Sequence, residues 1–166
     1  MTTERRVRWG IYPTGRITHQ FVQDFRDVRN GEVVAVAARR KAAAEAFAAR
    51  YGIPFAHGSY EELLADPGVD AVYIATPHSL HAHNTTDAIR AGKHVLCEKP
   101  FTVSVAESQA VFEVARRHSS FVMEGMWTYF LPAIRQALEW VAEGRIGTLR
   151  QVKADFGYPL LPFDPL

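Results

Sequence analysis

Residues 6–38 of this 166-residue chain read RVRWGIYPTGRITHQFVQDFRDVRNGEVVAVAA. The segment from Arg6 to Ile11 is typical of a strand, and apolar residues from Ile17 to about Val28 recur at helical spacing. Asn30-Gly31 is a turn signal, and a second strand is predicted from Glu32 to Ala38. Together these segments have the size and order of a β-α-β unit.

The turn between the first strand and the helix lies where a dinucleotide pyrophosphate would rest on a helix N-terminus. The glycine fingerprint G-x-G-x-x-G would need glycines at positions 13, 15 and 18, but the chain has Pro13, Gly15 and Thr18. Only the middle glycine, which lets the backbone approach the pyrophosphate, is present. Because Pro13 offers no N–H and cannot adopt a positive φ, we expect a loop of different geometry.

Strands and helices alternate through the rest of the first 123 residues. Helical patterns cover 41–51, a short stretch after Ser59, 79–90 and 103–118, and short strands are predicted at 54–56, 71–75, 94–97 and 121–123. Alternation of this kind favours a parallel sheet covered by helices. The expected fold class is therefore α/β, with a Rossmann-like, doubly wound parallel sheet.

The strand His94–Cys97 runs directly into Glu98-Lys99-Pro100. In an open α/β sheet, ligands bind beyond the carboxyl ends of the strands, so this carboxylate and amine are placed at the candidate site. A lysine held there can donate a proton or a hydrogen bond to a carbonyl oxygen. From this tripeptide alone, a surface turn is an equally good interpretation.

The exit of the second strand, Ala37-Ala38-Arg39-Arg40-Lys41, has three adjacent cations and no carboxylate. NAD-selective sites use an acidic side chain near this point to bind the ribose hydroxyls, whereas arginine suits a 2′-phosphate. The pattern favours NADP over NAD. The alternative is a solvated basic start to the next helix, although cations at a helix N-terminus are electrostatically unfavourable.

Four longer segments carry a family resemblance. They are Arg8 to Ile11 with Thr14 to Ile17, Ala75 to His81, Ala91 to Pro100 and Glu124 to Thr128. With these segments the chain resembles the N-terminal half of the Gfo/Idh/MocA oxidoreductase family, and the Glu-Gly-Met-Trp-Thr segment resembles its dimeric dihydrodiol dehydrogenase group. Pro13 replaces a usual glycine of the family, and Tyr129 replaces an arginine of that group.

The resemblance implies an NAD(P)-dependent oxidoreductase that transfers hydride to or from a sugar, polyol or dihydrodiol carbon. Lys99 is the implied catalytic residue, and Trp127 and Tyr129 are candidate substrate contacts that could equally be packing residues. The expected cofactor-binding residues are Thr14, Gly15, Arg16, Ile17, Arg39, Arg40, Thr76, Pro77, His81, Glu98 and Lys99.

The chain is ample for one domain and short for two. We expect the dinucleotide-binding domain at 1–123 and the incomplete start of a second α/β domain at 124–166. In that second part, a helix is predicted to end at Gly144, and the alternating segment Thr148–Phe156 is typical of a half-buried strand. The resemblance implies that it is the first strand of the second sheet. In the family, an Asp/His pair that works beside the lysine comes from further along. A non-catalytic dinucleotide-binding or subunit-contact module is therefore the alternative function, and a fragment without function is a third.

Composition limits the choice of partners and compartment. Hydrophobic residues make up 48% of the chain, charged residues 22%, and the net charge of +1 gives no reason to expect nucleic acid or membranes as partners. No signal peptide or membrane span is readable, and the single cysteine, Cys97, suits a reducing, cytoplasmic setting. The spacing of His78, His81 and His83 does not favour a metal site. The partner that the family resemblance implies is a small carbonyl or polyol substrate, and a homo-oligomer is left open.

Overall fold

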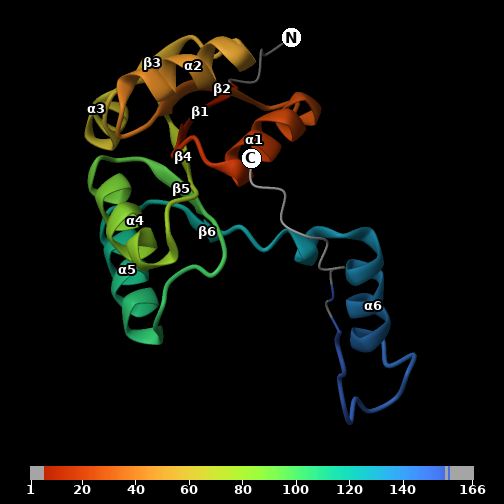
Figure 1. Ribbon diagram of the computed structural model, residues 1–166. Helices are drawn as coiled ribbons and strands as arrows, with labels where there is room; N and C mark the ends of the chain where they lie inside the picture. Colours follow the sequence, from red (N-terminus) through yellow and green to blue (C-terminus); the bar gives the residue numbers. More distant parts are fainter. Residues whose placement is uncertain (1–5, 156, 158–166) are drawn as a thin grey trace, which may run out of the picture. The chain divides into compact units, whose positions relative to one another are not determined.

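The structure, a computed structural model, describes residues 6–155 and 157, and the chain divides into two compact units (Figure 1). The first unit comprises residues 1–126 and the second residues 127–166. We expected the first domain to end at residue 123. Its last strand runs to Glu124, and the Gly125 N–H donates to the Cys97 carbonyl at 2.6 Å, so these residues belong to the first unit.

The first unit is built on one parallel sheet in the order β3-β2-β1-β4-β5-β6. The strands are β1 (Val7–Tyr12), β2 (Gly31–Ala37), β3 (Phe55–His57), β4 (Ala71–Ile74), β5 (His94–Cys97) and β6 (Val122–Glu124). This order and the covering helices confirm the predicted Rossmann-like, doubly wound fold. The chain winds outward from β1 in both directions, so the crevice for a ligand is expected where β1 and β4 lie side by side.

Helices cover both faces of the sheet (Figure 1). They are α1 (Arg16–Asp24) with the 3-10 turn η1 (Phe25–Asp27), α2 (Lys41–Tyr51), α3 (Tyr60–Ala65), the 3-10 turn η2 (His78–Leu80) with α4 (His81–Arg90), and α5 (Val105–Arg117). The core on one face includes side chains of α3, α4 and α5, and the core on the other includes those of α1 and α2. The helix predicted from Ile17 to about Val28 is shorter, because the α-helix ends at Asp24 and one 3-10 turn follows.

The strand side chains alternate between these two cores with the period of two expected for a pleated sheet. Tyr12 packs with α3, α4 and α5, whereas its neighbour Ile11 packs with α1 and α2. The whole of β4 is buried, which is usual for a central parallel strand that is covered by helices on both faces. This rigid centre fixes the positions of the loops that leave the carboxyl ends of the strands.

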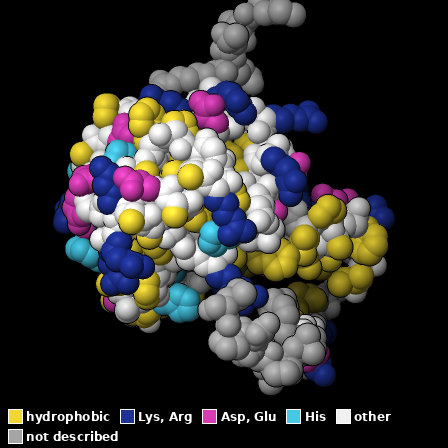
Figure 2. Space-filling view, turned by 45° about the horizontal axis from the view of Figure 1, so that its top comes forward, with side chains coloured by type: hydrophobic (Ala, Val, Ile, Leu, Met, Phe, Trp, Pro, Cys, Tyr) yellow, Lys and Arg dark blue, Asp and Glu magenta, His cyan; other side chains and the backbone are white. Residues whose placement is uncertain are grey.

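The second unit contains the 3-10 turn η3 (Trp127–Phe130) and helix α6 (Pro132–Ala142). Residues 148–155 form no strand, so the predicted strand Thr148–Phe156 is wrong over its described part. A strand needs a hydrogen-bonded partner, and no described segment pairs with this one. Apolar side chains of α6 are exposed, among them Ile134, Leu138 and Trp140, and yellow side chains gather on this lobe in Figure 2.

Charged side chains of both signs are interspersed over the face of the first unit that is seen in Figure 2. Among the described residues, none of the helices is both long enough and apolar enough to cross a membrane.

Candidate cofactor site

A cleft of about 440 Å³ lies at the carboxyl ends of β1 and β2. Its lining residues come from the turn after β1, the segment after β2, the first turn of α2 and the start of α3: Pro13, Thr14, Gly15, Ala38, Arg39, Arg40, Ala43 and Tyr60. The structure therefore brings the glycine turn and the pair of arginines to one hollow. Both groups were singled out in the sequence as contacts for opposite parts of one nucleotide.

The turn after β1 is shaped by Pro13 and Thr18. The Tyr12–Pro13 peptide bond is cis, and the buried Thr18 hydroxyl donates to the Pro13 carbonyl at 2.6 Å. Gly15 is the N-cap of α1, with no side-chain cap and no acidic residue in the first turn. A Cβ added at Gly15 would meet nothing within 4 Å, so the turn is open on this side. Free N–H groups beside open space fit an anion such as a pyrophosphate.

The basic side of the cleft has no built-in counter-charge. The side chains of Arg39 and Arg40 are exposed and take part in no hydrogen bond or ion pair with the described residues. None of the residues that line the cleft is acidic. Tyr60 stacks on Tyr12 with ring centroids 4.5 Å apart, and burial raises the pKa of its hydroxyl while Arg39 opposes this effect. Two free guanidinium groups suit a phosphate monoester.

The turn after β5 carries Glu98 and Lys99. The Glu98 N–H donates to the Ile74 carbonyl at 2.8 Å, which fixes the start of this turn against β4. The half-buried Glu98 carboxylate accepts from the Tyr73 hydroxyl at 2.7 Å and from the Lys99 N–H at 3.1 Å. The Lys99 side chain is exposed at the carboxyl end of the strand. Its amine is therefore free to reach a ligand above the sheet.

Neighbouring elements hold the rest of this turn. Glu124 of β6 accepts from the Phe101 N–H at 2.8 Å, and the Gly125 N–H donates to the Cys97 carbonyl. From α4, the His81 Nδ1 lies 2.7 Å from the Pro100 carbonyl oxygen. The backbone beside Lys99 is thus fixed by contacts from two sides.

The loop after β4 is joined to the same network. Thr76 is buried, and its hydroxyl accepts from the Asn84 side-chain amide at 2.9 Å. The His81 Nε2 lies 2.8 Å from the Thr76 carbonyl oxygen, and the His81 side chain is fully buried. The expected direct contact between His81 and a cofactor is not available in this structure, because both ring nitrogens face backbone carbonyls. Pro77, the next residue of the loop, is exposed.

Comparison with known proteins agrees with this geometry. Residues 7–126 match the family Gfo/Idh/MocA, described as an oxidoreductase family with an NAD-binding Rossmann fold. The chain belongs to this family.

Relatives with known names and structures are also found. Trans-1,2-dihydrobenzene-1,2-diol dehydrogenase from Mus musculus is 44% identical over 156 residues, which are 93% of this chain and 47% of the relative. D-xylose 1-dehydrogenase (NADP(+)) from Hypocrea jecorina is 43% identical over 162 residues, covering 90% of this chain and 41% of the relative. The chain thus spans about half the length of the curated relatives it matches.

Two solved structures have the same fold. An NAD-binding oxidoreductase from Klebsiella pneumoniae has a TM-score of 0.81 and 33% identity, over 86% of this chain and 40% of its own. The 3-ketoreductase KijD10 from Actinomadura kijaniata, solved with NADP and TDP-benzene, has a TM-score of 0.78 and 34% identity, over 84% and 43% of the two chains.

The two candidate substrate residues lie in the second unit of this chain. Trp127 and Tyr129 belong to η3 of the second unit, and more than half of each side chain is exposed. Tyr129 packs edge-on against Phe130 and lines a hollow of about 300 Å³ with residues of α6. Their contact with a substrate stays a prediction.

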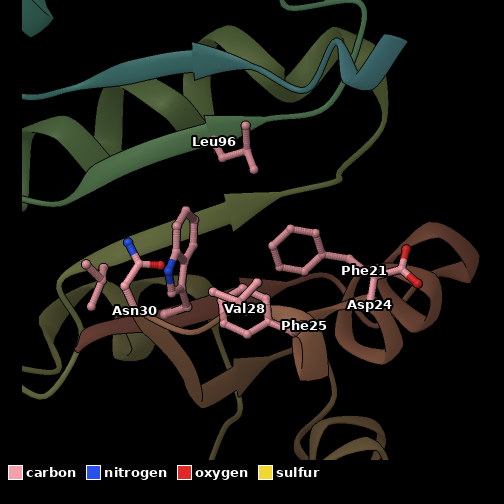
Figure 3. A pocket seen from close by; sticks show the side chains of 8 residues that line it. Phe21, Asp24, Phe25, Val28, Asn30 and Leu96 are labelled. Atoms are coloured by element: carbon pink, nitrogen blue, oxygen red, sulfur yellow. The ribbon is translucent and has the colours of Figure 1, made fainter. Parts of the chain in front are cut away.

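A third hollow, about 300 Å³ in volume, lies between α1 and the sheet (Figure 3). Its lining is mostly apolar and includes Trp9 from β1, Phe21 from α1 and Leu96 from β5. It is built from β1 and the middle of β5 and not from the loops at the carboxyl ends of the strands. We therefore do not assign it to the cofactor.

Sequence reasoning missed three side chains around the site: Tyr60 in the cleft, Tyr73 under Glu98, and Glu124 beside Phe101. A tyrosine in the otherwise apolar β4 was a usable signal, since a buried hydroxyl needs an acceptor. Glu124 stands in a segment that carries the family resemblance, but nothing in that segment indicated a contact with Phe101. The described ranges contain no cluster of three or more His, Cys, Asp or Glu side chains that could hold a metal ion.

Proposed function

We propose that this chain is the cofactor-binding half of an NADP-dependent oxidoreductase. The observation that carries the proposal is the single cleft that joins the open Gly15 turn to Arg39 and Arg40, which have no ion-pair partner in the part of the chain that the structure describes. A helix N-terminus can bind the pyrophosphate of either dinucleotide, whereas a basic pair beyond the second strand favours the 2′-phosphate that only NADP carries. The NADP named for the fungal xylose dehydrogenase and for the 3-ketoreductase supports the same choice.

Different residues would bind different parts of the cofactor. Thr14, Gly15 and the first N–H groups of α1, from Arg16 and Ile17, would bind the pyrophosphate, and Arg39 and Arg40 the 2′-phosphate. NADP, when bound, supplies or accepts the hydride. For the nicotinamide half of the cofactor, hydrogen-bond acceptors and donors would come from the turns after β4 and β5.

At those turns, Thr76 with Pro77 and the Glu98 carboxylate would orient the nicotinamide half. The Lys99 amine would donate a hydrogen bond or a proton to the oxygen of the reacting carbon, which makes Lys99 the proposed catalytic residue. His81 would act indirectly, through the two carbonyls that it contacts. Trp127 and Tyr129 are the proposed substrate contacts.

The proposed substrate is a sugar, polyol or dihydrodiol. Relatives named as diol and xylose dehydrogenases support this class, and each of them is about twice as long as this chain. The reaction of a whole protein that contains this chain is therefore part of the proposal. Because the chain has a single, buried cysteine and no disulfide partner for it, we also propose a reducing, cytoplasmic setting.

The test is a calorimetric titration of the purified chain with NADPH and NADH. We expect NADPH to bind about tenfold or more tightly than NADH, since each charge-assisted contact to the extra phosphate is worth about 1.5–3 kcal/mol. Arg39→Ala with Arg40→Ala should remove this preference and leave NADH binding unchanged. Arg50→Ala, at the other end of α2, is the matched control. Equal binding of both cofactors by the unchanged chain would refute NADP selectivity, and binding of neither would refute the proposed function.

The second candidate function is a subunit-contact module that forms a homo-oligomer. The exposed apolar side chains of α6 favour it, because such patches mark contact surfaces. Sedimentation of the chain over a range of concentrations tests this. A dimer that forms without cofactor binding would support the module, whereas a monomer that binds NADPH would support the enzyme half.

A further inference from the structure

Tyr73 is a buried polar side chain beneath the candidate site. It lies in the central strand β4 and is 2% exposed. Its hydroxyl donates to the Glu98 Oε1 at 2.7 Å, across from β4 to the turn after β5. A buried hydroxyl without an acceptor is costly, so this contact ties the position of the carboxylate to the sheet.

The Tyr73 ring is itself fixed by packing. It stacks on Phe21 with ring centroids 3.7 Å apart and an angle of 3° between the ring planes. Figure 3 shows Phe21 projecting from α1 toward the sheet, and Leu96 is the register partner of Tyr73 in β5. Because the ring is held between helix and sheet, its hydroxyl has little freedom to leave Glu98.

The Glu98 carboxylate is in turn held at both oxygens. Oε1 accepts from Tyr73 and Oε2 accepts from the Lys99 N–H at 3.1 Å. A Cβ added at Gly125 would lie 3.4 Å from Oε1, so the backbone of Gly125 closes another side. Each carboxylate oxygen has more than one acceptor site, so Glu98 can still accept from a ligand. Burial, followed by the contact with Glu98, raises the pKa of Tyr73, which keeps its hydroxyl a donor.

We infer that Tyr73 is a positioning residue for the nicotinamide half of the cofactor, and that it acts through Glu98 without touching the ligand itself. This inference rests on the proposed function. The adenosine bisphosphate end fits the cleft at β1 and β2, whereas Glu98 lies at the end of β5, beyond the crevice between β1 and β4. The ribose hydroxyls and carboxamide N–H of the nicotinamide half are donors that match a fixed carboxylate.

The experiment compares two probes by calorimetry on the full 166-residue chain. NADPH spans both halves of the site, whereas adenosine 2′,5′-bisphosphate occupies only the adenosine end. We expect Tyr73→Phe to weaken NADPH binding about tenfold, as for a lost hydrogen bond to a charged group, and to leave bisphosphate binding unchanged. Tyr51→Phe is the control, because its hydroxyl contacts His19 at 2.7 Å outside the cleft.

A double-mutant cycle shows whether Tyr73 acts through Glu98. In the Glu98→Ala background, Tyr73→Phe should cause no further loss of NADPH affinity. Unchanged NADPH binding by Tyr73→Phe would overturn the inference, and so would an equal loss for both probes or a full loss in the Glu98→Ala background. If the unchanged chain bound neither probe, the proposed function would fail as well, so the two failures are distinguishable.

Discussion

Replacing His81 by phenylalanine should strongly destabilise the first unit. The side chain is fully buried, and its ring nitrogens lie 2.7 Å from the Pro100 carbonyl oxygen and 2.8 Å from the Thr76 carbonyl oxygen. Phenylalanine keeps a ring of similar size but donates no hydrogen bond. The two loops would then lose a side chain of α4 that contacts them both.

The size of the effect follows from these contacts. A neutral imidazole donates from one nitrogen, and the doubly protonated ring donates from both. A buried carbonyl that loses its donor costs about 1–3 kcal/mol. We therefore expect the free energy of unfolding of His81→Phe to fall by about 2–4 kcal/mol, a large part of the 5–15 kcal/mol that is usual for a domain.

Urea unfolding followed by circular dichroism measures this change. His83→Phe is the control on the same helix, because that side chain is 72% exposed, and a substitution there should stay within about 0.5 kcal/mol of the parent chain. If His81→Phe lost less than about 1 kcal/mol, the two contacts would not be strong hydrogen bonds, and the reasoning about the connected loops would be refuted.

Three further predictions concern the framework. Burial raises the pKa of the Cys97 thiol from 9.0 to about 12, so the folded chain keeps a proton that the unfolded chain loses as the pH rises. Between pH 8 and pH 10, the free energy of unfolding of the parent chain should therefore fall on the order of 1 kcal/mol more than that of Cys97→Ala, as measured by parallel urea titrations. Lys93→Met should cost about 2–4 kcal/mol in the same assay, because the buried amine donates to two backbone carbonyls before β4, and a loss below about 0.5 kcal/mol would contradict this. Gly10→Ala should lower the thermal midpoint and cost about 1–3 kcal/mol, since the new Cβ would lie 2.8 Å from Leu63 Cδ2, and an unchanged midpoint would show that Leu63 moves aside.

The bounds of helices and strands could be predicted from the sequence wherever the local pattern of apolar residues matched their burial in the fold. Helix 41–51 and strand 94–97 have the predicted bounds, because one is rich in alanine and ends at Gly52 in the left-handed conformation, and the other is a short run between turn signals. Segment 148–155 also alternates, but alternation alone does not supply a neighbouring strand. The strand prediction failed there because pairing is not a local property.

The same distinction applies to the candidate site. The rule that ligands bind at the carboxyl ends of parallel strands placed Gly15, Arg39 and Glu98 at that edge of the sheet. It needed only the order of strands and helices. The contacts that fix Glu98 and Phe101 join residues 25 and 23 positions apart, Tyr73 with Glu98 and Phe101 with Glu124. Which tyrosine or carboxylate faces which turn depends on strand neighbours and register, and these follow from tertiary packing.

The central place of β1 in the sheet has a consequence for biosynthesis. Trp9 pairs with Val33 of β2 on one side and with Ala71 of β4 on the other, so one of the two neighbours of β1 is made much later than β1 itself. Until β4 has emerged from the ribosome, one edge of β1 has no partner and its apolar side chains have no complete core. The nascent chain is therefore expected to need protection by chaperones for longer than a helical protein of equal length, whose contacts are mostly local.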